Sequence, residues 1–179
     1  FVQALLERTG VPIVLDADAL NAFAGDPDRL MGREEVGVVI TPHPGEMARL
    51  LNTSIEAVQH DRLRHAREFA ASHRVVVVLK GHRTVIAAPD GRTFVNLTGN
   101  SGMATGGTGD LLTGMIAAWF AQLLDAEAAC KLAVYLHGTA GDLAEADEGD
   151  VALVAGDLAT RLGDAVLELT ARRQVKRDS

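Results

Sequence analysis

A glycine-rich segment that runs directly into an apolar helix is the strongest sign of chemistry in this sequence. Residues 105–110 have the sequence TGGTGD, and a predicted apolar helix at 111–124 follows at once. Glycines at the start of a helix leave backbone N–H groups free, and these donors and the helix dipole together favour an anion such as phosphate. The segment is not a Walker A loop, because no lysine follows its last glycine, and it lacks the third glycine of the dinucleotide-binding fingerprint. The alternative is a flexible loop capped by Asp110.

Asp110 is the residue of this segment that could do more than bind. A carboxylate in the first turn of a helix is stabilised by the helix dipole and often serves only as a cap. Beside bound phosphates, a carboxylate is repelled unless it has a further role, and accepting a proton from an attacking hydroxyl group is such a role. From the residues alone, base and cap both remain open for Asp110.

Two other segments carry polar side chains directly after a predicted buried strand. Residues 80–84 (KGHRT) fit a nucleotide contact, or else an ordinary β-turn with a solvated lysine. Residues 41–46 (TPHPGE) hold His43 between two prolines, with Glu46 three residues further on. His43 could donate to a substrate and Glu46 could hold Mg²⁺ through water, or else the segment is a rigid turn that leads into the next helix. Exposed positions are expected for His60, His65, His73 and His82, and a satisfied core or interface position for His137.

The elements that must position these segments alternate between strands and helices. Buried strands are predicted at 11–15, 36–40 and 75–79, a β-hairpin at 84–97, and helices at 1–9, 19–23, 46–51, 55–72, 111–124, 126–144 and 153–171. This alternation predicts an α/β layered fold with a mostly parallel sheet, in which ligands lie at the carboxyl ends of the strands. Asp16 and Asp18 follow the first strand, where they could bear on a metal or a ribose, or cap the short helix that begins at Ala19.

The composition excludes several classes of protein. The 179 residues are 47% hydrophobic and 23% charged, which fits a globular domain and not a disordered chain. The 17 Lys and Arg residues against 24 Asp and Glu give a net charge of −7, and only 4% of residues are aromatic, so no nucleic-acid partner is expected. The single cysteine excludes a disulfide scaffold. Neither a membrane span nor a secretory signal is found, so we expect no membrane partner and a cytoplasmic protein.

Four segments, taken together and in order, resemble the ADP/ATP-dependent NAD(P)H-hydrate dehydratase family. They are 14–21 (VLDADALN), 40–46 (ITPHPGE), 79–81 (LKG) and 99–110 (GNSGMATGGTGD). The resemblance runs from residue 1 to about residue 170 and implies a ribokinase-like three-layer α/β/α fold. It also implies a metabolite-repair lyase that dehydrates the S epimer of hydrated NADH or NADPH, with ADP or ATP as phosphoryl donor and Mg²⁺ as companion ion.

The resemblance also implies roles for individual residues. Asp110 would be the catalytic base, and His43 and Asp110 would contact the hydrated cofactor. The adenine nucleotide would be held by Lys80, Gly81, His82, Arg83, Thr84 and Gly109. An anion hole would be formed by the backbone N–H groups of Gly106, Gly107, Thr108, Gly109 and Asp110. Related sugar kinases carry Asn-x-x-Glu where this chain has His43-x-x-Glu46, which implies a place for Glu46 near Mg²⁺.

The family's domain normally has a substantial N-terminal portion before the segment that matches Phe1. We therefore expect residues 1–171 to be the C-terminal part of a dehydratase domain, followed by a polar tail at 172–179. The resemblance implies a homotetramer and a fused or separate NAD(P)H-hydrate epimerase. Two alternatives remain open: a kinase of the same fold that acts on a vitamin-precursor alcohol, and a non-catalytic module that binds adenine nucleotides. The kinase would not be expected to carry both the turn at His43 and the full run 103–110.

Overall fold

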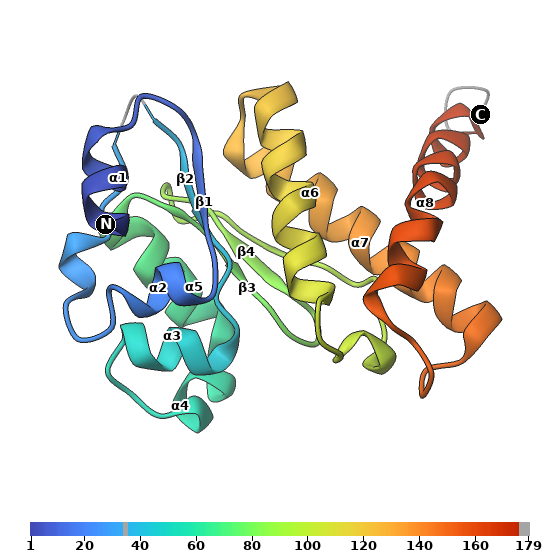
Figure 1. Cartoon of the computed structure of the whole chain (residues 1–179), viewed down its shortest axis with the longest axis horizontal. Helices are drawn as coiled ribbons and strands as arrows, with labels where there is room; N and C mark the ends of the chain where they lie inside the picture. Colours follow the sequence, from blue (N-terminus) through green and yellow to red (C-terminus); the bar gives the residue numbers. More distant parts are fainter. Residues whose placement is uncertain (34–35, 176–179) are drawn as a thin grey trace.

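The computed structural model describes residues 1–33 and 36–175, with side chains described as far as Ala171 at the C-terminal end. A single five-stranded sheet forms the centre of the described chain, with helices on both of its faces (Figure 1). Among the described residues, no helix has both the length and the apolar character needed to cross a membrane.

The sheet contains a parallel half and an antiparallel half. Its strands lie in chain order: β1 (Ile13–Leu15), β2 (Val38–Ile40), β3 (Val76–Leu79), β4 (Val85–Ala87) and β5 (Thr93–Val95). The pairs β1–β2 and β2–β3 are parallel, and β4–β5 is the expected antiparallel hairpin. The pair β3–β4 is antiparallel as well, so the sheet is mixed and not mostly parallel as expected. Because the first three strands run in the same direction, the residues that follow them meet at one edge of the sheet.

The two faces of the sheet pack against different helices. Alternate residues of a strand point to opposite faces, so Val77 and Leu79 join one apolar core while Val76 and Val78 join another. The first core is covered by helices from the N-terminal half, which are α1 (Val2–Arg8), α2 (Asp18–Asn21), α3 (Pro44–Leu50), α4 (Ile55–His60) and α5 (Arg62–His73). The second core is covered by α6 (Thr108–Leu123) and α7 (Ala126–Glu148), with α8 (Ala155–Val175) packed against α7 (Figure 1). The expected three-layer α/β/α architecture is therefore confirmed.

Several element boundaries differ from the sequence-based expectation. The single helix expected at 55–72 is two helices, because Asp61 has φ −143° and ψ 66° and its side chain accepts a hydrogen bond from Arg64 N in the first turn of α5. Helix α3 begins at Pro44, two residues before the expected start at 46, because a proline fits the first helical position, where no partner is needed for its missing N–H. Helix α8 reaches Val175, and residues 176–179 of the expected tail lie outside the described residues.

The most consequential difference is the start of α6. This helix begins at Thr108, three residues earlier than expected, so Thr108, Gly109 and Asp110 form its first turn. Gly107 precedes the helix with φ +88°, in the left-handed region that glycine adopts at little cost. The last three residues of the glycine-rich segment are therefore the first turn of the helix, and not part of a loop before it.

Candidate functional site

Three side chains that follow the parallel strands meet beside α6. Lys80, directly after β3, places its Nζ 2.7 Å from Oδ1 of Asp16, directly after β1. The other carboxylate oxygen of Asp16, Oδ2, accepts a hydrogen bond of 2.7 Å from Thr113 Oγ1 on α6. The third side chain is that of Thr41, directly after β2, and its Oγ1 lies 3.4 Å from Thr113 Oγ1. The expected clustering at the carboxyl edge of the sheet is confirmed for these residues.

The carboxylate of Asp16 is held in its charged form. Burial would raise its pKa, but hydrogen bonds from Lys80 and Thr113 and the positive charge of Lys80 outweigh this effect, so the pKa lies below its usual value of 3.8. The side chain of Lys80 is only 18% exposed. Lys80 is therefore not the solvated turn lysine of the alternative reading.

The entry of α6 presents a row of unused backbone donors. None of the N–H groups of residues 106–110 donates a hydrogen bond to a described residue, and the first bond that enters the helix is Leu111 N to Gly107 O, at 3.0 Å. The Thr108 hydroxyl does not block these donors, because it donates to the carbonyl oxygens of Met103 and Thr105. Consecutive free N–H groups at the positive end of a helix form an anion site. This geometry supports an anion hole at residues 106–110.

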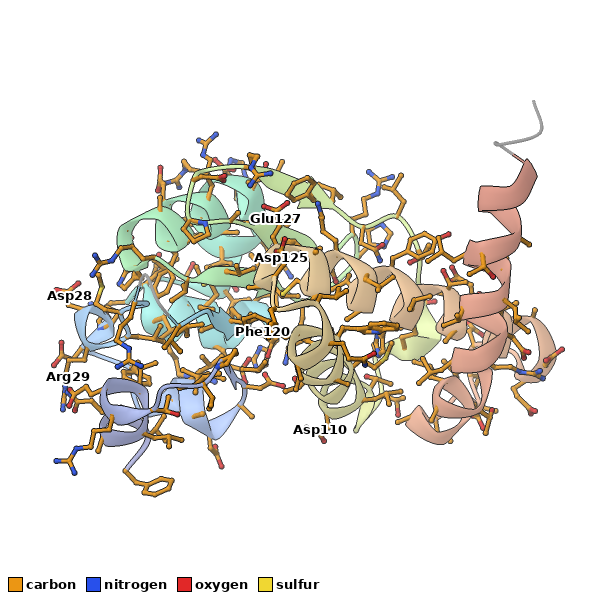
Figure 2. All side chains as sticks on the ribbon, turned by 90° about the horizontal axis from the view of Figure 1, so that it is seen from above. Asp28, Arg29, Asp110, Phe120, Asp125 and Glu127 are labelled. Atoms are coloured by element: carbon orange, nitrogen blue, oxygen red, sulfur yellow. The ribbon has the colours of Figure 1, made fainter. Side chains whose placement is uncertain are left out.

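Asp110 lies at the edge of this row with its carboxylate exposed. The side chain points outward from the first turn of α6 (Figure 2). It makes no hydrogen bond or ion pair with the described part of the chain, so it does not cap the helix by bonding to a backbone N–H. A carboxylate that is accessible, stabilised by the helix dipole and adjacent to an anion site has the arrangement required of a base toward a bound hydroxyl group.

A cavity of about 510 Å³ opens between the end of β3, the entry of α6 and the middle of α7. Its lining includes all of residues 80–84 together with Gly109, so the structure brings the expected nucleotide-binding residues into one place. Further lining residues, which the sequence did not single out, include Asn96, Thr98, Asn100, Leu112, Val134 and Gly138. The volume lies within the range of small-molecule sites.

The backbone of residues 80–84 is held by an arginine of α5. Arg62 donates hydrogen bonds to the carbonyl oxygens of Leu79 (2.8 Å) and Lys80 (3.1 Å), and it also donates to that of His82. Gly81 has φ +136°, a conformation that a residue with a β-carbon rarely adopts. Sequence reasoning missed Arg62, because an arginine in a helix that carries several arginines gives no signal of its own.

His43 and Glu46 form a reciprocal cap at the start of α3. The Nδ1 atom of His43 accepts from Gly45 N at 2.9 Å, and Oε2 of Glu46 accepts from His43 N at 2.7 Å. Glu46 is 5% exposed, and its Oε1 lies 3.5 Å from Nε2 of His43. Because Pro42 O accepts a 2.8 Å hydrogen bond from Lys80 N, this turn lies beside the Lys80 segment. The imidazole is half-exposed and fixed in orientation.

Helix α7 holds the segment at residues 98–100, which leads to the glycine-rich residues 105–110. Both carboxylate oxygens of Asp142 accept a hydrogen bond of 3.0 Å from Gly99 N, and Oδ1 also accepts one from Asn100 Nδ2. At Gly138 the helix backbone touches the preceding segment: an added β-carbon would collide with Thr98 Oγ1 and lie 2.7 Å from the Thr98 carbonyl carbon. The absence of a side chain at Gly138 therefore lets the backbone at Thr98 approach α7.

We expect Gly138→Ala to lower the free energy of unfolding by about 1–3 kcal/mol, because the new methyl group meets backbone atoms that cannot rotate away. Equilibrium denaturation measures this effect. Gly163→Ala is the control: nothing lies within 4 Å of a β-carbon there, so removal of a helical glycine should leave stability unchanged or raise it by up to about 1 kcal/mol. Equal stabilities for the two variants would contradict the close approach at Gly138.

Two histidines are buried. His137 of α7 is 8% exposed, and its Nε2 lies 2.9 Å from the carbonyl oxygen of Thr108, as expected for a satisfied core residue. His73 was expected to be exposed, and this expectation is wrong: it is 9% exposed and stacks on Phe69, with ring centroids 3.8 Å apart. The stacking follows from the i, i+4 spacing of the two rings on α5.

We expect the stability of the protein to fall as the pH falls below 6.5. Burial lowers the pKa of His137 from 6.5, although the bond to Thr108 partly opposes the shift, so the folded state prefers the neutral ring. Protons therefore bind the unfolded chain first, at a cost of at most about 1.4 kcal/mol per pH unit for each such group. Unfolding free energies measured across this range should change less in His137→Gln than in the wild type. If the unfolding free energy changed equally with pH in both proteins, a neutral buried His137 would be contradicted.

The chain matches known proteins over most of its length. The family model described as NAD(P)H-hydrate dehydratase matches residues 1–165. A bifunctional NAD(P)H-hydrate repair enzyme of Moorella thermoacetica is 53% identical over 157 residues, which cover 88% of this chain and 29% of that protein.

Two solved structures have the same fold. The ADP/ATP-dependent NAD(P)H-hydrate dehydratase of Bacillus subtilis, co-crystallised with ATP/Mg²⁺, has a TM-score of 0.84 and 38% identity, covering 93% of this chain and 58% of that chain. A ribokinase-like superfamily protein of Enterococcus faecalis has a TM-score of 0.69 and 29% identity, covering 90% of this chain and 64% of that chain, which confirms the expected fold class. The chain therefore spans only part of the length of these relatives.

Proposed function

Because this chain belongs to the NAD(P)H-hydrate dehydratase family, we propose that it carries the nucleotide site and the catalytic base of an enzyme that repairs hydrated NADH or NADPH. The substrate is the S epimer, which bears a hydroxyl group on C6 of the nicotinamide ring. Hydroxide is a poor leaving group, whereas phosphate is a good one. The observation that carries this proposal is the row of free N–H groups at residues 106–110, which includes the exposed Asp110 and lies beside the Lys80 ammonium.

The proposed reaction has two steps. The C6 oxygen attacks the terminal phosphorus of ADP, Asp110 takes the hydroxyl proton, and AMP leaves. The C6–O bond then breaks with release of phosphate, C5 gives up a proton to solvent, and the double bond between C5 and C6 of the reduced ring is restored. During transfer, the N–H groups of residues 106–110 stabilise the charge that spreads over the phosphoryl oxygens. His43, held rigidly by its cap, would contact the hydrated ring.

The adenine nucleotide would occupy the 510 Å³ cavity, with residues 80–84 and Gly109 in contact with it. A companion Mg²⁺ would be held chiefly by the nucleotide phosphates and by water, as this ion commonly is, and would neutralise charge on the transferring group. In the described part of the chain, no three metal-ligating side chains lie together, and Glu46 directs its carboxylate oxygens to His43. Any contact of Glu46 with the ion would therefore run through water.

The family resemblance supports a proposal for the wider setting of the enzyme. We propose a homotetramer in the cytoplasm that works with an NAD(P)H-hydrate epimerase, which would convert the R epimer into the substrate. The repair enzyme of Moorella thermoacetica is named as bifunctional, which supports an epimerase fused to the dehydratase in some members.

Product analysis tests the function. Purified protein is incubated with S-epimeric hydrated NADH, ADP and Mg²⁺, and the absorbance of reduced nicotinamide is followed together with AMP and inorganic phosphate. We expect NADH, AMP and phosphate to appear in equal amounts. A stable phosphorylated alcohol would instead indicate a kinase of the same fold, and nucleotide binding without turnover would indicate a binding module.

A further inference from the structure

We propose that Asp16 is a positioning residue that, together with Thr113, holds the ammonium of Lys80 in the phosphate site at the entry of α6. The inference rests on the proposed function, because it takes the anion at this entry to be the nucleotide's phosphate chain. It extends that function to Asp16, after β1, and Thr113, on α6, which lie 64 and 33 positions from Lys80 in the sequence.

The first observation is the position of the ammonium. A β-carbon added at Gly109 would lie 3.5 Å from Lys80 Nζ, so the ammonium rests against the first turn of α6, beside the free N–H groups. Gly109 and Lys80 both line the cavity.

The second observation is electrostatic. The N-terminal end of a helix carries a partial positive charge, so a lysine placed there is repelled unless negative charge accompanies it. In the described structure that negative charge is the Asp16 carboxylate, 2.7 Å from Nζ, and both side chains are largely buried, at 11% and 18% exposure. An ammonium has three donors, so the contact with Asp16 leaves others for an anion bound at the same entry. A cation held at the positive end of a helix is the arrangement expected of a site for a multiply charged anion.

The third observation is that the anchor is itself fixed. Thr113 donates to Oδ2 of Asp16 at 2.7 Å while Lys80 bonds to Oδ1, so the carboxylate is fixed at both oxygens. Thr113 lies about one turn further along α6 than Gly109, and a shift of Asp16 would therefore have to break a bond to the same helix that carries the anion site. The hydroxyl of Thr41 donates to Leu15 O, which ties β1 to β2 next to Asp16. The ammonium of Lys80, which follows β3, is therefore held against α6 by Asp16, which follows β1.

A binding series tests the proposal. Affinities for adenosine, AMP, ADP and ATP are measured by calorimetry for the wild type, Asp16→Asn, Thr113→Val and the control Asp26→Asn. Asp26→Asn removes the same charge from an exposed side chain outside the site. If Asp16 positions Lys80 toward phosphate, Asp16→Asn should weaken the binding of ADP and ATP by about 10- to 100-fold, the range of one charge-assisted hydrogen bond. The affinity for adenosine should stay within about 2-fold of the wild-type value. Thr113→Val should also weaken ADP and ATP binding more than adenosine binding, with a smaller loss of affinity than in Asp16→Asn.

A double mutant shows whether Asp16 acts through the lysine. Lys80→Met combined with Asp16→Asn should bind ADP about as weakly as Lys80→Met alone, because the second change has nothing left to position. An equal loss for adenosine and ADP in Asp16→Asn, or fully additive losses in the double mutant, would overturn the proposal and leave Asp16 a purely structural residue. Wild-type affinity for ADP in Asp16→Asn would overturn it as well. Failure of the wild type to restore NADH, with the binding series as expected, would overturn the proposed function alone.

Discussion

Replacement of Asp110 by asparagine should abolish turnover while nucleotide still binds. The side chain keeps its size, but it can no longer accept the hydroxyl proton, and loss of a general base typically lowers the rate by about 100- to 10,000-fold. Nucleotide affinity should be retained, because the N–H groups of residues 106–110 are backbone groups and Asp110 does not line the cavity. Single-turnover rates and calorimetry on the same preparation measure the two effects separately.

The matched control for this variant is Asp164→Asn. Asp164 is an exposed helical aspartate of α8 whose described partner is Arg161, at 3.2 Å, and its loss changes the net charge equally. Exposed pairs of this kind contribute about 1 kcal/mol or less to stability, so the control should have wild-type activity. Full activity in Asp110→Asn would remove Asp110 from the role of base and leave it a first-turn residue favoured by the helix dipole.

Replacement of Lys80 by methionine should have the second-largest effect. It removes the ammonium at the entry of α6 and should raise the dissociation constant for ADP by about 10- to 100-fold, as expected for a charged hydrogen-bond donor to phosphate. It also leaves the buried Asp16 carboxylate without its cation, so we expect a lower stability near neutral pH. Calorimetry with ADP and equilibrium unfolding measure the two consequences.

Lys131→Met separates these effects from a general loss of positive charge. Lys131 lies on α7, pairs with Glu127 at 2.9 Å and stacks over Phe94, away from the cavity lining. Its removal should leave ADP affinity unchanged. Equal ADP affinities for Lys80→Met and the wild type would show that the ammonium does not contact the nucleotide.

The sequence predicted the parts of the site that are local. The free donors at residues 106–110 follow from glycines placed before an apolar helix, and the position of Lys80 at a strand end follows from the apolar run before it. For Asp110 the sequence left base and cap open, and the structure shows that its carboxylate bonds to no described residue, so any capping effect would act through the helix dipole alone. The layered α/β fold was also predictable, because strands buried on both faces alternate with helices.

The contacts between distant segments could not be predicted. Arg62, Thr113 and Asp142 each hold a loop of the site, yet in sequence they are ordinary polar residues of helices. Which carboxylate meets Lys80 depends on the order of the strands, and only the folded chain shows that β1 and β3 flank β2. The break between α4 and α5 was missed for a local reason: the side chain of Asp61 caps a new helix within a segment of continuous helical propensity.

The fate of the substrate's C6 oxygen tests the central claim most directly. Hydrated NADH that carries oxygen-18 in its hydroxyl group can be prepared by hydration in labelled water and then incubated with the protein, ADP and Mg²⁺. If the hydroxyl is phosphorylated and then leaves as phosphate, mass spectrometry should find one labelled oxygen in each inorganic phosphate released. Label recovered in water, with unlabelled phosphate, would contradict phosphoryl transfer to the C6 oxygen.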